Sequence, residues 1–175
     1  MFNGGGCGYP AFCGINNKLA FRDASMDSTV FITILTGVLT YVAGQIVVKL
    51  VIEPVQELRK TIGQISHALI ERANVISNPG VPSDEVITET SKHLRLLSSQ
   101  LQSHLYLVPC YSATAKVFSL PTKDDLLAAS KSLIGLSNSL YRSTEKIYEQ
   151  NAARVEKICD SLAIYIPDDE RISKV

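Results

Sequence analysis

Residues 29–48 read TVFITILTGVLTYVAGQIVV, a run of twenty residues without a single charged side chain. At about 1.5 Å per residue, a helix of this length crosses the roughly 30 Å hydrocarbon core of a bilayer. The run is too long, and begins too late in the chain, for a typical cleaved signal peptide. It therefore predicts a retained signal-anchor, a transmembrane helix over residues 28–52.

Small residues recur along one face of this predicted span. Thr33, Gly37, Thr40 and Gly44 lie at helical spacing, and such a face lets two helix backbones approach closely in lipid. Gln45 adds a polar group that would seek a partner across the same interface. The pattern predicts self-association of the span, so we expect a homo-oligomer.

The residues before the span predict a flexible, glycine-rich tail over 1–27. This tail holds Cys7 and Cys13, which would pair only in an oxidising compartment, and the sequence leaves their pairing open. Basic residues near the span number two before it and three after it. This small excess favours a cytoplasmic C-terminal part of a single-pass protein of the cell membrane.

A seam of aliphatic residues continues beyond the span at alternating intervals of four and three, as in a coiled coil. Its members are Val51, Val55, Leu58, Ile62, Ile65 and Leu69. Pro54 lies within this seam and lacks a backbone N–H group, so it predicts a hinge at the membrane surface.

Three long helices are predicted after the span, over residues 53–77, 83–107 and 122–166. Asn78-Pro79-Gly80-Val81-Pro82 separates the first two, and Thr122 with Asp125 forms a capping-box pattern before the third. The third is so long that its second half must break, fold back or project toward another chain. The fold class is therefore all-α: one transmembrane helix continuing into an antiparallel three-helix cytoplasmic bundle, with a tail over 167–175.

The connector over residues 108–120 is apolar and aromatic, with Lys116 as its one charge. Two interpretations remain open. In one, a short helix caps the bundle. In the other, the segment lies in the membrane interface, with Tyr106, Tyr111 and Phe118 at the depth of the lipid headgroups.

No constellation of reactive residues points to an enzyme. The chain has 17 basic and 17 acidic residues, so no overall field favours nucleic acid. His93 and His104 are too far apart to share a metal ion, and no nucleophile motif or phosphate loop is present. We therefore expect no catalytic residue, no cofactor and no metal site.

Two resemblances accompany this interpretation. Tyr41-Val-Ala-Gly-Gln, Glu53-Pro-Val-Gln-Glu-Leu-Arg-Lys and Ile134-Gly-Leu-Ser-Asn-Ser-Leu are similar to segments of a group of uncharacterised bacterial single-span membrane proteins. More loosely, Pro54 with the aliphatic residues that follow it, and Asp84-Glu85-Val86, resemble the two helices of a HAMP-type signalling linker. Ala68 stands where that family has a glycine.

These features favour a membrane-anchored, non-enzymatic helical scaffold or signalling module that acts through oligomerisation. Its expected partners are the lipid bilayer, further copies of the chain and a protein that the sequence does not identify. The alternative is a membrane-disrupting or channel-forming effector gated by its helical bundle, in which threonines and Gln45 would line a pore.

Overall fold

The computed structural model describes residues 17–165, and within them every regular element is helical, without a strand. This confirms the all-α prediction. The chain divides into two compact units, Met1–Gln45 and Ile46–Val175. Cys7, Cys13 and the predicted tail over 167–175 lie outside the described residues.

The first unit contains most of helix α1 (Asn17–Val47). The helix begins before the predicted span, so the prediction of a flexible tail is wrong for residues 17–27. No glycine or proline occurs between Asn17 and Thr36, and good helix formers such as leucine and alanine fill the first turns. Every side chain from Asp27 to Gln45 is exposed. The most apolar 18-residue segment of the helical stretch Asp27–Glu71 has a mean hydropathy of 1.9. This helix is long and apolar enough to cross a membrane.

A π-helix, η1 (Val48–Ile52), precedes α2 (Glu53–Glu71). Pro54 is the second residue of α2, where its ring would crowd the carbonyl of Leu50 in a regular α-helix. The backbone N–H of Glu53 donates instead to the carbonyl of Val48, five residues back, which is the spacing of a π-turn. The irregularity at the predicted hinge is therefore a widened turn just before the proline.

Two of the predicted helices are broken. The helix expected over 53–77 ends at Glu71, and a short α3 (Ala73–Ser77) follows Arg72. The helix expected over 122–166 is two helices, α6 (Lys123–Ser139) and α7 (Glu145–Leu162). A straight helix would leave the apolar residues of its second half in water. Folding back at residues 140–144 buries Val155, Ile158 and Leu162 in the core.

The middle of the second unit is close to the prediction. Helix α4 spans Asp84–Leu107, and Ser83 before it has the extended backbone of an N-cap without the side-chain hydrogen bond. The connector holds a short helix, α5 (Tyr111–Phe118). Thr122 and Asp125 form the predicted capping box at the start of α6.

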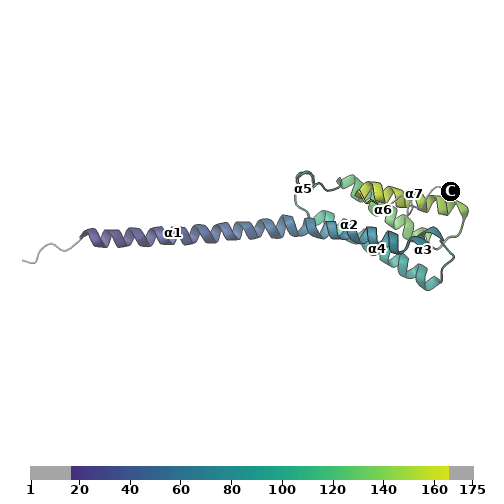
Figure 1. Cartoon of the computed structure of the whole chain (residues 1–175), viewed down its shortest axis with the longest axis horizontal. Helices are drawn as coiled ribbons and strands as arrows, with labels where there is room; N and C mark the ends of the chain where they lie inside the picture. The colour runs from purple at the N-terminus through teal and green to yellow at the C-terminus, as the bar shows by residue number, and fades with distance from the viewer. Residues whose placement is uncertain (1–16, 166–175) are drawn as a thin grey trace, which may run out of the picture. The chain divides into compact units, whose positions relative to one another are not determined.

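One hydrophobic core joins these helices. Figure 1 shows the ribbons of α2, α4, α6 and α7 gathered in the second unit. Its fully buried side chains come from all four longer helices of the second unit, and they include Leu58, Leu101, Leu133 and Ile158. Of the six seam residues, Val55, Leu58, Ile65 and Leu69 are buried, whereas Val51 and Ile62 are half-buried. The seam thus packs into the core of its own chain. Where three helices were expected in the bundle, the second unit has four main helices, α2, α4, α6 and α7, and two short ones, α3 and α5.

Helices α4 and α6 are joined by serines spaced seven residues apart. The Ser98 hydroxyl donates to the carbonyl of Ser130 at 3.1 Å, and the Ser91 hydroxyl donates to the carbonyl of Ser137 at 3.1 Å. Moving seven residues forward on one helix moves the partner seven residues back on the other, so the two helices run antiparallel. Because serine is small, the two backbones lie close enough for side chain to reach main chain.

Candidate functional site: the exposed apolar helix and the connector

Among the described residues, no atom outside α1 approaches the two glycines of its small-residue face. A Cβ atom added at Gly37 or at Gly44 would meet no atom within 4 Å outside the helix itself. The large side chains around the helix are likewise exposed, among them Phe31, Leu39 and Tyr41. The predicted site residues of this face are therefore all accessible to a partner.

The threonines of this face satisfy their own hydroxyl groups. Those of Thr33, Thr36 and Thr40 donate to carbonyl oxygens four residues back, at 2.8, 2.8 and 2.9 Å. Such bonds remove a donor that would be costly in hydrocarbon. Within residues 17–165 the amide of Gln45 makes no hydrogen bond. Gln45 follows Gly44 and therefore lies about 100° around the helix from it, beside the small-residue face.

Three hydrogen bonds hold the connector: one comes from α2, and two join residues within the segment 109–121. The Arg59 guanidinium on α2 donates to the carbonyl of Phe118 at 2.5 Å. The Tyr111 hydroxyl donates to the carbonyl of Pro121 at 2.6 Å, and the Thr114 hydroxyl donates to that of Pro109 at 2.9 Å. Burial raises the pKa of the Tyr111 phenol above its ordinary value, and the charge of Asp125 raises it further. The phenol therefore remains a donor well into the alkaline range.

The three predicted interface residues take different positions. Tyr106 is 71% exposed, with the ammonium group of Lys123 5.8 Å from the centre of its ring. Tyr111 and Phe118 are only partly exposed and pack against the core. The prediction missed two exposed apolar residues of the same region, Leu107 and Val117. Both lie in or next to the apolar segment that the sequence singled out, but tyrosine and phenylalanine drew attention to the aromatic positions.

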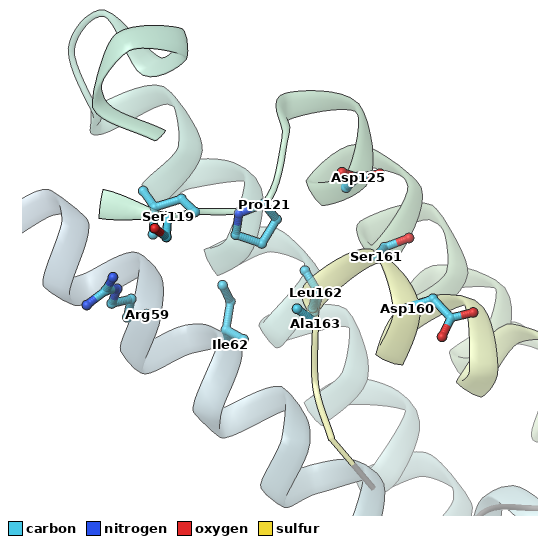
Figure 2. A pocket seen from close by; sticks show the side chains of 10 residues that line it. Arg59, Ile62, Ser119, Pro121, Asp125, Asp160, Ser161, Leu162 and Ala163 are labelled. Carbon is cyan, nitrogen blue, oxygen red and sulfur yellow. The ribbon is translucent and has the colours of Figure 1, made fainter. Parts of the chain in front are cut away.

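An open pocket of about 430 Å³ lies beside the connector, in the region shown in Figure 2. Arg59 and Ile62 contribute from α2, Ser119 and Pro121 from the end of the connector, and Asp160 from the end of α7. Its charged side chains are of both signs, and the Arg59 guanidinium already holds the Phe118 carbonyl. The pocket is therefore the place where α2, the end of the connector and the end of α7 meet. Its mixed charges favour neither an anionic nor a cationic ligand.

Two polar contacts of the second unit were not predicted from the sequence. His104 places its Nδ1 atom 2.8 Å from the hydroxyl of Thr61, so it joins α4 to α2 and does not simply face solvent. Asn151 is 1% exposed and accepts a hydrogen bond from the Ser139 hydroxyl at 2.5 Å. Within the described part of the chain, no group of three histidine, cysteine or acidic residues is arranged to hold a metal ion.

Comparison with known proteins adds no relative: no family model, no curated protein and no solved structure matches this chain.

Proposed function

We propose that the chain is a single-pass membrane protein whose α1 helix crosses the bilayer and associates with copies of itself, so that the second unit is displayed as a non-enzymatic scaffold or signalling module. The observation that carries this proposal is an apolar helix whose most hydrophobic segment is 0% buried by the other residues that the structure describes. In water such a surface would be strongly unfavourable, whereas in lipid it is the ordinary state of a span.

The first unit offers the contact between copies. Gly37 and Gly44 are seven residues apart and both open to a neighbour. In lipid, helices associate through close packing of small residues and through hydrogen bonds between polar side chains. The unused amide of Gln45 lies one residue beyond Gly44 and supplies the second kind of contact.

The seam after the span no longer supports association between chains. Leu58 and Ile65 are both 0% exposed, because they pack in the core of their own second unit. We therefore assign self-association to the face of α1 and assign the seam to the folding of the second unit. We further propose that the second unit is an antiparallel helical bundle, that it faces the cytoplasm and that it binds another protein there.

The alternative of a channel-forming effector receives less support. A pore needs polar groups that face its lumen, and the hydroxyl donors of Thr33, Thr36 and Thr40 are used by the helix itself. Only their acceptor positions and the Gln45 amide remain for water or ions. The scaffold is therefore the function that we propose.

Crosslinking in native membranes tests the interface. The double variant Gly37→Leu with Gly44→Leu is expected to lose most of the crosslinked oligomer, because two leucines would hold the helices apart. The matched control is Leu35→Phe with Val42→Phe, which has the same seven-residue spacing on the opposite side of the helix. The assignment fails if the glycine variant crosslinks like the unaltered chain, or if the control loses as much oligomer.

A further inference from the structure

Exposed apolar side chains lie at the end of α4 and in the connector, close in sequence to buried ones. Tyr106, Leu107 and Val117 are 71%, 59% and 77% exposed, and they lie on both sides of the exposed Cys110. Val108, by contrast, is only 5% exposed and belongs to the core. A segment surrounded by water would need only its buried apolar side chains, so the exposed ones indicate a further contact.

The register of α2 and α4 shows at which end of the second unit this surface lies. Thr61 contacts His104, and Arg72 forms an ion pair with Glu89 at 2.9 Å, so the two helices run antiparallel. Extending this register places Leu107 level with the first turns of α2. Figure 1 shows α5 at the same end of the unit as the start of α2.

The same end of the unit receives the chain from the apolar helix. The π-helix before α2 carries Val48 and Leu50, which are 38% and 59% exposed. A bilayer that holds the apolar helix therefore reaches the second unit at this end, through the covalent continuity of the chain. The exposed apolar side chains that α4 and α5 present at this end are those of Tyr106, Leu107 and Val117.

We propose that Tyr106, Leu107 and Val117 rest in the headgroup layer of the phospholipid bilayer and form a second membrane contact of the second unit. Aromatic side chains with one polar end are favoured at this depth, and aliphatic ones gain from the acyl boundary just below it. Lys116 and Lys123 are exposed beside them, where their ammonium groups reach lipid phosphates. The inference rests on the proposed span, because without it no bilayer is held at this end.

The native Cys110 allows a direct test in the full chain. Cys7→Ser and Cys13→Ser are introduced, and an environment-sensitive fluorophore is attached to Cys110 under conditions that leave the buried Cys159 unlabelled. The protein is reconstituted in phosphatidylcholine–phosphatidylglycerol vesicles with a headgroup nitroxide lipid as quencher. The control label is on Ser83→Cys in a Cys110→Ser background, about 36 Å away at the other end of α4.

We expect the quencher to reduce the Cys110 fluorescence about threefold more than that of the Ser83→Cys label, since interfacial side chains lie within the headgroup layer. Tyr106→Ser with Val117→Ser should abolish the difference, and exposed positions such as these leave the core intact. Equal quenching of the two labels in chains that float with the vesicles after an alkaline wash would overturn this inference alone. Failure to float would overturn the proposed span and this inference with it. Crosslinking of Cys110 to Cys110 without lipid quenching would show that a second copy covers the surface, and would also overturn it.

Discussion

Replacing Asn151 with alanine is expected to destabilise the second unit more than any surface change on α7. Asn151 is 1% exposed and joins three helices. Its Nδ2 atom donates to the carbonyl of Ile76 on α3 at 3.2 Å, and its Oδ1 atom accepts from Ser139 on α6 and from Arg154 on α7. One amide thus connects α3, α6 and α7.

The magnitude follows from the groups left behind. Ile76 lies in the last turn of α3, where carbonyl oxygens lack a donor within the helix, so loss of the amide leaves a buried acceptor unsatisfied. That costs about 1–3 kcal/mol. Ser139 loses less, because its hydroxyl can donate instead to the Leu136 carbonyl, 2.8 Å away. With the small cavity added, Asn151→Ala should lower the free energy of unfolding by about 2–4 kcal/mol.

The thiol of Cys159 provides the assay. It is 6% exposed on the same helix, two turns beyond Asn151, so it reacts with a thiol reagent only when α7 opens. The full chain in detergent micelles is treated with reagent, and the fast reaction of exposed thiols is separated from the slow one of Cys159. A loss of about 2–4 kcal/mol should accelerate the slow reaction roughly 30- to 700-fold, at about 1.4 kcal/mol per factor of ten.

Two further variants decide whether the hydrogen bonds are responsible. Gln150→Ala alters an exposed neighbour on the same helix and should change the slow rate by less than about threefold. Asn151→Leu keeps the volume of the side chain but removes its donor and acceptor, and should accelerate the reaction nearly as much as alanine. If Asn151→Leu reacts like the unaltered chain, Asn151 acts through packing alone and the reasoning about the Ile76 carbonyl is refuted.

Three more outcomes are expected. Gly80→Ala should destabilise the unit by about 1–3 kcal/mol in thermal unfolding, because Gly80 has φ +77° and a Cβ atom there would lie 2.8 Å from that of Ser143. As its control, Gly63→Ala, at an open position of α2, should instead stabilise the unit by about 0.5–1 kcal/mol. The raised pKa of Tyr111 adds stability below its ordinary pKa of 10.0 that is lost as the pH rises through the folded-state value. The ultraviolet titration of the unaltered chain minus that of Tyr111→Phe should therefore have its midpoint above pH 10.0, and a lower midpoint would contradict this. Arg59→Met should increase amide hydrogen exchange in α5 about two- to fivefold, since a partly solvated hydrogen bond is lost, and unchanged exchange would show that Arg59 does not hold the connector.

Much of the helical pattern was predictable from local sequence. The charge-free run, the capping box at Thr122 and the start of α4 after Ser83 each depend on residues close together in the chain. The break between α6 and α7 was not predictable in the same way. Residues 140–144 contain neither glycine nor proline, and the heptad spacing of leucines runs across them. What ends α6 is the gain from burying the apolar face of α7, a property of the folded unit.

The candidate sites were predictable to a different degree. The small-residue face of α1 follows from spacing alone, and the structure leaves Gly37 and Gly44 open. In the connector, spacing and composition located the segment but not the direction of its side chains. Tyr111 points to the Pro121 carbonyl because Pro121 ends the connector beside it, a contact that no helical period encodes. Helical spacing likewise did not indicate that the side chains of Tyr106 and Val117 would be exposed.

The fate of the aliphatic seam shows why a heptad repeat does not by itself specify an oligomer. Intervals of four and three residues place side chains on one face of a helix, whichever helix then covers that face. Here α4 of the same chain is tethered to α2 through α3 and the turn at residues 78–83, so its effective concentration beside α2 is far higher than that of a second copy. The seam therefore packs against helices of its own chain, and Leu58 is 0% exposed as a result. No such tether joins a second apolar helix to α1 within residues 17–165, so its small-residue face is left for a partner supplied by the membrane or by another chain.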